Sequence, residues 1–157
     1  IRSGDKRLFT AVIRDITERK RINEELQNSI SILASTFEAT ADGILVIDRN
    51  EKVVTYNQRF VDLSQIPAEI LESMDHSTFL DFVKDRLIDP ESFIEKTKQL
   101  VGLPETHSRD IIEFKDGRIF ERYTHPQILD GEVVGRVVSF RDVTDRKRAE
   151  IESQVIS

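Results

Sequence analysis

Several residue types that define common functional sites are missing or scarce in this sequence. It has no cysteine and no tryptophan, and only six glycines and four prolines among 157 residues. Without cysteine the chain cannot form disulfides, thiolate nucleophiles or cysteine-based zinc sites. It has no run of about 18 apolar residues, so we expect no membrane insertion. A net charge of −6 without a basic stripe argues against binding to nucleic acid.

What the chain does contain is a large apolar fraction and a repeated octapeptide. Apolar residues make up 38% of the sequence, and nine residues are phenylalanine, enough for the core of one domain. RDITERKR at 14–21 returns as RDVTDRKR at 141–148. Each copy follows an apolar stretch, at 8–13 and 133–140, and precedes a charged segment with helical spacing. The repeat therefore predicts two strand-to-helix junctions, although a plain helix cap explains either copy taken alone.

Residues 18–40 have the pattern of a long helix with one apolar seam. The seam consists of Leu26, Ile30, Leu33 and Phe37, spaced by 4, 3 and 4 residues, which is the heptad spacing of a coiled coil. Asn23 lies one heptad before Ile30 and would set the register of a dimer. We predict a parallel homodimer held by this helix and an apolar face of the sheet. The alternative is a monomer whose helix folds back on its own sheet.

The middle of the chain predicts two strands followed by short helices. Strands are expected at 43–48 and 52–57, and Asn57 is placed to cap a helix that Pro67 stops. Further helices are expected at 68–72, from Ser77 onward, and after Asp89, which would cap its helix with Pro90 in the first helical position.

The last third of the sequence predicts a three-stranded meander. The strands are expected at 108–114, 118–128 and 132–142, joined by Asp-Gly turns at 116–117 and 130–131. Because the strands at 43–48 and 133–140 are apolar on both faces, each side of the sheet should be covered. The short helices would cover one side, and the long N-terminal helix or a partner chain the other.

These segments give the chain a family resemblance. ADGILVIDRNEKVVTYNQRF at 41–60, FKDGRIFERYTHPQILDGEVVGRVVSFRDVTDRKRAE at 114–150 and the D-x-T at 142–144 resemble a PAS domain with its C-terminal motif. PAS domains are sensor modules of bacterial and archaeal histidine kinases, diguanylate cyclases and cyclic-dinucleotide phosphodiesterases. Residues 1–21 resemble the last hairpin of a preceding PAS domain. Separated from its sheet, that segment should pair with another copy or continue as a helix into the linker.

The resemblance implies a division of the chain and a fold. Residues 1–17 would end an upstream PAS domain, 18–40 form an amphipathic helical linker, 41–144 the PAS sensor domain, and 145–157 begin an outgoing signalling helix. The fold would be α+β, with a five-stranded antiparallel sheet in the order 2-1-5-4-3 and helices over one face. We accordingly expect the chain to be a segment of a longer protein.

The resemblance also assigns a signal junction. Asp142 and Thr144 match the D-x-T motif, as do Asp15 and Thr17 in the first copy. In the family this junction ties the final strand to the outgoing helix, so that strain in the sheet alters the pose of the helix. We expect the carboxylate of Asp142 to pair with Arg141 or Arg146 as well as to cap the helix.

A PAS fold further implies a cavity, which we expect to be lined by Phe60, Phe79, Phe82, Phe93, Ile94, Thr97, Tyr123 and His125. A flavin adduct of the light-oxygen-voltage type is excluded because it needs a reactive cysteine. Haem is not expected, because haem-binding PAS domains usually ligate iron through a histidine in the helix before the third strand, and residues 90–101 contain none. We expect no metal and no cofactor, and favour a small organic ligand or an empty cavity. Of His76, His107 and His125, the last is the one placed to face the cavity.

Nothing in the sequence predicts catalysis. The phosphoacceptor context of a histidine kinase, the Gly-Gly pair of a diguanylate cyclase and a P-loop are all missing from it. Two functions remain: a sensory and relay module, and a structural dimerisation spacer with no ligand. A sizeable, partly polar cavity would favour the first, and a cavity filled by phenylalanines the second. The expected partners are a second copy, the upstream PAS domain and a downstream output domain. We expect this part of the protein in the cytoplasm, with a membrane anchor elsewhere in the full-length protein left open.

Overall fold

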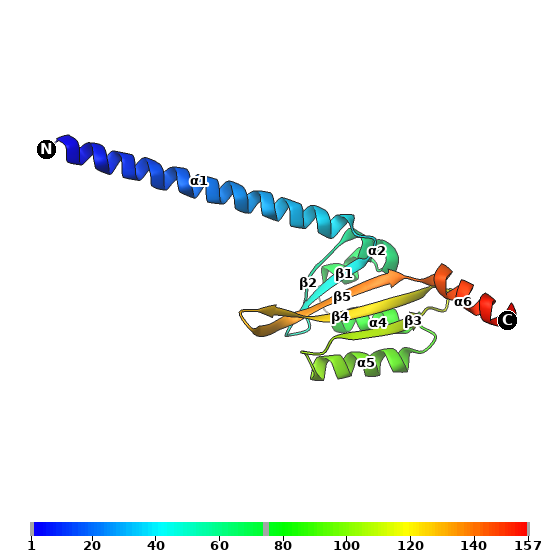
Figure 1. Ribbon diagram of the computed structural model, residues 1–157. Coiled ribbons are helices and arrows are strands. Elements are labelled where there is room, and N and C mark those ends of the chain that lie inside the picture. Colours follow the sequence, from blue (N-terminus) through cyan, green and yellow to red (C-terminus); the bar gives the residue numbers. More distant parts are fainter. Residues whose placement is uncertain (1, 74–75, 157) are drawn as a thin grey trace. The chain divides into compact units, whose positions relative to one another are not determined.

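The computed structural model describes residues 2–73 and 76–156 and divides into two units. The first unit is a single helix, α1 (Arg2–Ala39), and the second is an α+β domain that begins at Thr40 (Figure 1). Among the residues that the structure describes, no helix has both the length and the apolar composition needed to cross a membrane.

Helix α1 is continuous through both the expected hairpin and the expected linker. The strand predicted at 8–13 is therefore wrong, and the boundary predicted between residues 17 and 18 falls inside the helix. A strand needs a neighbour for its backbone hydrogen bonds, whereas a helix satisfies them within itself. The expectation that this segment continues as a helix into the linker agrees with the structure.

The second unit contains one antiparallel sheet of five strands. These are β1 (Gly43–Asp48), β2 (Val53–Tyr56), β3 (Ser108–Glu113), β4 (Ile119–Leu129) and β5 (Glu132–Asp142), in the order β2-β1-β5-β4-β3. The α+β class and the strand order implied by the family resemblance are confirmed. The turn between β4 and β5 has φ angles of 51° at Asp130 and 79° at Gly131, the two positive angles that a tight hairpin turn requires.

Four short helices pack on one face of this sheet, and a fifth leaves its end. They are α2 (Gln58–Ser64), α3 (Ala68–Glu72), α4 (His76–Lys84) and α5 (Pro90–Gly102), while α6 (Thr144–Ile156) follows β5. The predicted caps are confirmed: Asn57 accepts a hydrogen bond from Phe60 N, and Asp89 accepts one from Ser92 N. Pro90 stands at the start of α5, where its missing N–H costs no hydrogen bond.

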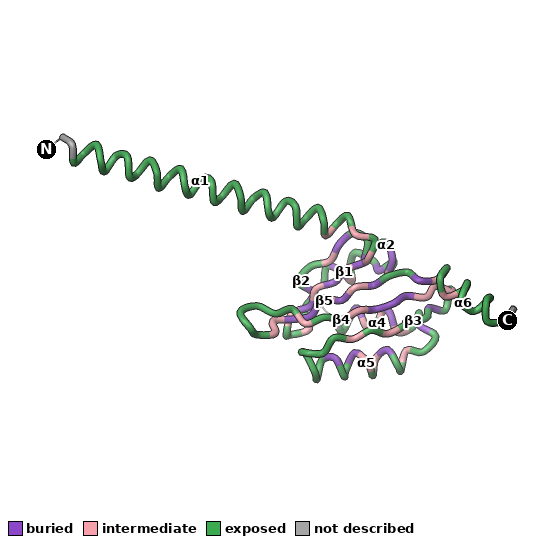
Figure 2. Tube along the Cα trace, in the orientation of Figure 1, coloured by how far each residue is buried: buried purple, intermediate pink, exposed green. Residues whose placement is uncertain are grey.

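The core lies between these helices and the inner face of the sheet (Figure 2). Leu45, Ile47, Phe120, Val138 and Phe140 point inward from the strands, and each is less than 9% exposed. The outer face carries Ile44, Val46 and Val137, which are half-buried. Its covering by α1 or by a partner chain stays a prediction.

Candidate functional site

The junction between β5 and α6 is built around Thr144. The Thr144 hydroxyl accepts a hydrogen bond from Ile119 N at 2.9 Å and donates one to the Asp142 carboxylate. Asp142 Oδ1 also accepts from Thr144 N at 2.9 Å. Val143 between them is buried, and its N–H donates to Ile119 O at 2.9 Å. The D-x-T residues thus fasten the start of α6 to the first residue of β4.

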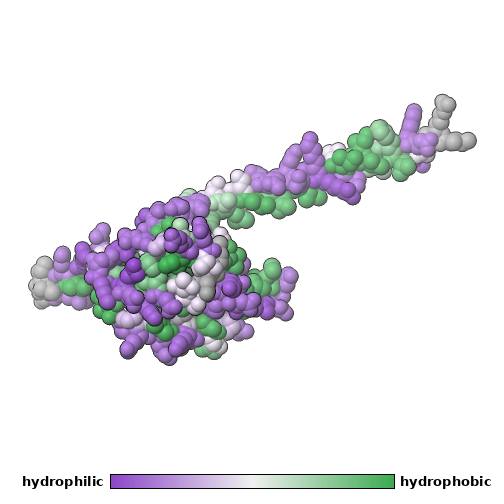
Figure 3. Space-filling model, turned by 180° about the vertical axis from the view of Figure 1, so that it is seen from behind, coloured by the Kyte–Doolittle hydropathy of each residue, from purple (hydrophilic) through white to green (hydrophobic). Residues whose placement is uncertain are grey.

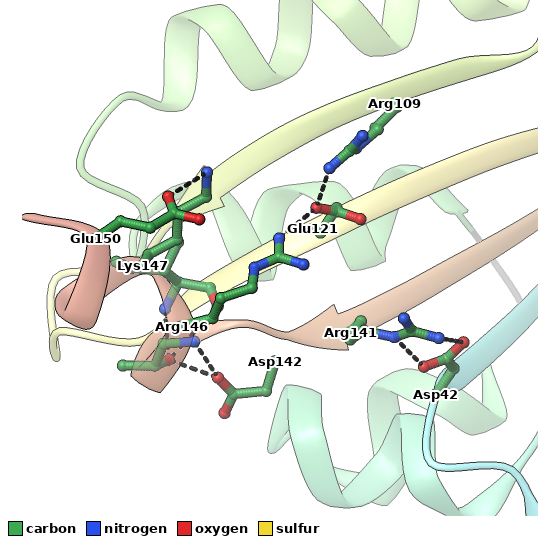
Figure 4. A network of polar contacts seen from close by, with 10 residues as sticks. Asp42, Arg109, Glu121, Arg141, Asp142, Arg146, Lys147 and Glu150 are labelled. Atoms are coloured by element: carbon green, nitrogen blue, oxygen red, sulfur yellow. Dashed lines mark hydrogen bonds and ion pairs between the residues drawn. The ribbon is translucent and has the colours of Figure 1, made fainter.

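The two arginines beside Asp142 bind other carboxylates (Figure 4). Arg141 Nε and Nη2 donate to the two oxygens of Asp42, at 2.9 and 3.2 Å. Arg146 Nη2 donates to Glu121 Oε2 at 2.9 Å. The predicted ion pair between Asp142 and either arginine is therefore wrong. The carboxylate of Asp142 instead accepts the hydrogen bonds of Thr144.

Glu121, which the sequence analysis did not single out, completes the polar network at this junction. It lies in β4 on the outer face of the sheet, and its side chain is only 2% exposed. Arg109 of β3 donates to it at 2.8 Å, and Arg146 of α6 at 2.9 Å. The Tyr123 hydroxyl, Arg109 and Arg146 together lower the pKa of Glu121 from 4.5 to about 2. One ionised carboxylate therefore joins two strands of the sheet to the outgoing helix.

The first copy of the octapeptide forms no such junction, because it lies within α1. The Thr17 hydroxyl donates to Ile13 O at 2.8 Å, and Asp15 pairs with Arg19 at 3.3 Å. Ile16 is 58% exposed, whereas Val143, which occupies the same place in the second copy, is 4% exposed. The junction expected at Asp15 and Thr17 is therefore wrong. The same residue types make contacts within a helix here.

The heptad positions of α1 extend beyond the predicted seam, and Figure 3 shows a second group of hydrophobic residues toward the N-terminal end of the helix. The alternating spacing of 3 and 4 residues that joins Leu26, Ile30, Leu33 and Phe37 continues toward the N-terminus. The positions on this line are Phe9, Val12, Ile16, Arg19 and Asn23. The first three are 48–68% exposed, and Leu26, Ile30 and Leu33 are 50–69% exposed. Because residues 8–13 were predicted to form a strand, the heptad spacing was not followed into them.

The predicted cavity is nearly filled by its own side chains. Phe60, Phe79 and Phe93 line a space of about 20 Å³, room for about one water molecule. Phe82 is half-buried at the edge of the core, with the guanidinium of Arg86 3.6 Å from its ring centroid. Ile94 is also half-buried and packs against the core.

The buried side chain of Arg122 lies between the sheet and α5, where it forms an ion pair with the half-buried Asp110. Arg122 of β4 donates to both carboxylate oxygens of Asp110 at 2.9 Å and to Thr97 Oγ1 at 3.0 Å. Its guanidinium also lies 4.5 Å from the ring centroid of Phe93. Thr97 is therefore buried as predicted, but as a partner of this arginine.

Tyr123 and His125 do not face the cavity, so their assignment to it is wrong. Successive residues of a strand point to opposite faces. Because Arg122 and Thr124 are buried on the helix side, Tyr123 and His125 lie on the outer face of the sheet. There His125 is exposed, and its Nδ1 is 2.9 Å from Nδ1 of His107.

The chain was compared with protein families and with solved structures. A family model described as PAS fold matches residues 37–151. The structure is similar to the sensor region of a sensor histidine kinase, with 17% identity and a TM-score of 0.54, over 69% of this chain and 41% of that chain. It is similar to the PAS domain of an HTR-like protein from Haloarcula marismortui, with 21% identity and a TM-score of 0.55, over 78% of this chain and 98% of that one.

A third similar structure is that of an RNA-binding light-oxygen-voltage receptor, at 19% identity and a TM-score of 0.61, over 81% of this chain and 37% of that one. The chain thus spans well under half the length of this receptor and of the sensor region. At these identities the similarity concerns the fold. A search of curated proteins found no match.

Proposed function

This chain belongs to the PAS fold family, and we propose from that premise that it is a sensory and signal-relay module. In this proposal a change in the sheet alters the pose of α6, which carries the signal to an output domain. The observation that carries the proposal is the contact of α6 with Glu121. Arg146 reaches from the first turns of the helix to a buried carboxylate that Arg109 also binds. A shift of β3 against β4 would therefore change the anchor of the helix.

The filled core limits which kind of signal the domain can receive. A space of about 20 Å³ holds no organic ligand unless phenylalanine side chains move. We therefore propose that the input is conformational and enters from the segment preceding β1. There Asp42 is paired with Arg141, the residue directly before the D-x-T. This pair joins the entrance of the domain to its exit.

The same filled core favours a second candidate, a structural spacer that holds two output domains in register. Both candidates include a homodimer formed through the seam of α1. Both also include an upstream PAS domain and a downstream histidine kinase or cyclic-dinucleotide enzyme, in the cytoplasm. They differ in whether the contact between α6 and the sheet changes the output.

A charge-matched pair of variants separates the two candidates. Arg146→Gln removes the bond from α6 to Glu121, whereas Lys147→Gln removes a cation whose partner, Glu150, lies on the same helix. Each variant would be fused to a histidine kinase reporter after Ser157, and autophosphorylation measured. A relay predicts that Arg146→Gln changes kinase activity and Lys147→Gln does not. Equal activities in both folded variants would leave the spacer as the better description.

Ligand binding is tested separately by native mass spectrometry of the freshly purified chain. A mass that equals the sum of the polypeptides supports conformational input. A retained small molecule would contradict it. The molecule would then have either displaced the core phenylalanines or occupied the open groove of about 530 Å³ between α5 and β3.

A further inference from the structure

Two histidines face each other at the end of the ladder between β3 and β4. Ser108 is paired with Thr124, so His107 and His125 occupy the next opposed positions of the two antiparallel strands. Their Nδ1 atoms are 2.9 Å apart, and both side chains are exposed. The ring of Tyr123 is parallel to that of His125, within 4°. Neither histidine takes part in the junction or in the core.

The contact between the two nitrogens requires a single shared proton. A neutral imidazole has one N–H donor and one acceptor nitrogen. One Nδ1 therefore donates and the other accepts in this pair. A metal ion can take the place of that proton, because neutral imidazole nitrogen is a good ligand for copper, nickel and zinc.

The distance between the nitrogens is short enough for both to bind one metal ion. Bonds from a metal to histidine nitrogen are about 2.0–2.1 Å, so two such ligands at a right angle lie about 2.9 Å apart. Ligands at a tetrahedral angle would lie about 3.4 Å apart with the same bond length. The spacing of 2.9 Å in this pair, which is also that of an ordinary hydrogen bond, is close to both values. A small rotation of the exposed rings would therefore bring both nitrogens onto one ion.

We propose that His107 and His125 form a bidentate site for a late first-row divalent metal ion, with Cu²⁺ bound most tightly and Ni²⁺ next. Among the described residues, no group of three histidine, aspartate or glutamate side chains could hold a metal ion. Water would therefore complete the coordination. A bound ion would fix the end of the edge strand β3 to β4. Arg109, which binds Glu121, lies two residues farther along the same strand. The site itself does not depend on the proposed function.

Copper titration of the purified chain tests the site directly. The 29 acidic residues offer weak oxygen sites, which an excess of Mg²⁺ occupies because Mg²⁺ prefers oxygen ligands. Under that condition we expect one equivalent of Cu²⁺ to bind, with two nitrogen ligands in the electron paramagnetic resonance spectrum. His107→Ala and His125→Ala should each weaken binding about tenfold or more, because the chelate is lost. His76→Ala, the third histidine, should leave the affinity unchanged.

A thermal measurement gives a second, independent readout. An ion that binds only the folded chain raises its melting temperature. Ni²⁺ should therefore raise the melting temperature of the wild-type chain and of His76→Ala but not that of His107→Ala. Circular dichroism without metal checks that each variant is folded, and His125→Gln replaces any alanine variant that is not. Equal copper affinities in wild type and in the folded His107 and His125 variants would overturn the proposal, as would a failure of the wild type to bind.

Discussion

Glu121 and Arg122 are adjacent in β4 and both are buried, yet they point to opposite faces of the sheet. Arg122 pairs with Asp110 beneath α5, and Glu121 pairs with Arg109 and Arg146 on the outer face. A buried charge without its partner is strongly destabilising. A shift of β4 by one residue would exchange the two faces. These two charges, which point to opposite faces, therefore favour the observed register of β4.

The charge of Glu121 makes a testable contribution to the pH dependence of stability. Its folded-state pKa of about 2 is below its ordinary value of 4.5. The stabilisation is therefore fully present above about pH 4.5 and is lost as the pH falls toward 2. We expect Glu121→Gln to have a lower melting temperature than the wild type at pH 7, and this difference to shrink between pH 5 and 2.5. Melting curves at several pH values measure it.

The matched control for this experiment is Glu113→Gln, at an exposed position of neighbouring β3. Its difference from the wild type should stay small at every pH. If the two variants show the same pH profile, Glu121 makes no special contribution and the network in Figure 4 is not a stabilising one.

At the level of elements, α1 has the pattern of one half of a longer coiled coil. With Phe9, Ile16, Asn23, Ile30 and Phe37 at position a of the heptad, Val12, Arg19, Leu26 and Leu33 fall at position d. Ile at a with Leu at d favours a parallel dimer, and a single Asn at a sets its register. In that arrangement Asp15 at g would also lie opposite Lys20 at e of the second helix, a complementary pair. A seam from residue 9 to residue 37 gives about four heptads in place of two.

The length of the seam can be tested with one substitution. Ile16→Asp places a charge in the extended part of the seam, outside the two heptads of Leu26 to Phe37. If the coiled coil begins near Phe9, this change should shift the chain from dimer to monomer at tens of micromolar, as measured by sedimentation equilibrium. Thr10→Asp adds the same charge at position b, outside the seam, and should not. A dimer that tolerates Ile16→Asp but not Leu33→Asp would confine the seam to the last two heptads.

Local chemistry explains which elements could be predicted from the sequence. The Asp130–Gly131 turn, the Asn57 cap and the Asp89–Pro90 start of α5 each depend on a few adjacent residues, and all three are confirmed. The strand at 8–13 was wrong because β-rich composition does not supply a neighbouring strand.

The outer face of the sheet could not be predicted in the same way. In β4 the inward positions include Arg122 and Thr124, so the polarity of the residues does not tell which face His125 lies on. The role of Glu121 depends on residues 12 positions before it and 25 after it. Those residues come together only through the pairing of β3 with β4 and the placement of α6 against the sheet.

In the domain as a whole, the residues just before β1 and just after β5 are both bound to the central strands of the sheet. Asp42, just before β1, pairs with Arg141 at the end of β5, and Asn57 Nδ2 donates to Asp42 O. Thr144 then ties α6 to β4, and Arg146 ties it to Glu121. The residue before β1 and the helix after β5 are thus each held by one of two neighbouring strands, β5 and β4.

If this connection transmits a signal, the junction can be weakened without unfolding the domain. Asp142→Ala removes the acceptor that holds Thr144, and Thr144→Val removes the hydroxyl bound by Ile119 N. Each change should cost about 1 kcal/mol, small against the stability of about 5–15 kcal/mol typical of a domain. Urea unfolding measures this cost. The exposed Thr55→Val in β2 is the control.

The same variants should loosen the outgoing helix far more than they weaken the fold. Two helix poses that differ by a few kcal/mol are redistributed by a change of this size. Gln127 in β4 and Glu152 in α6 are both exposed. Spin labels at these two positions report the distance between the sheet and the helix by pulsed electron paramagnetic resonance. We expect a broader distance distribution in Asp142→Ala and Thr144→Val than in Thr55→Val. A distribution as narrow as that of the control, together with the loss of stability, would show that the D-x-T only caps the helix, and that the repeated octapeptide has no part in signalling.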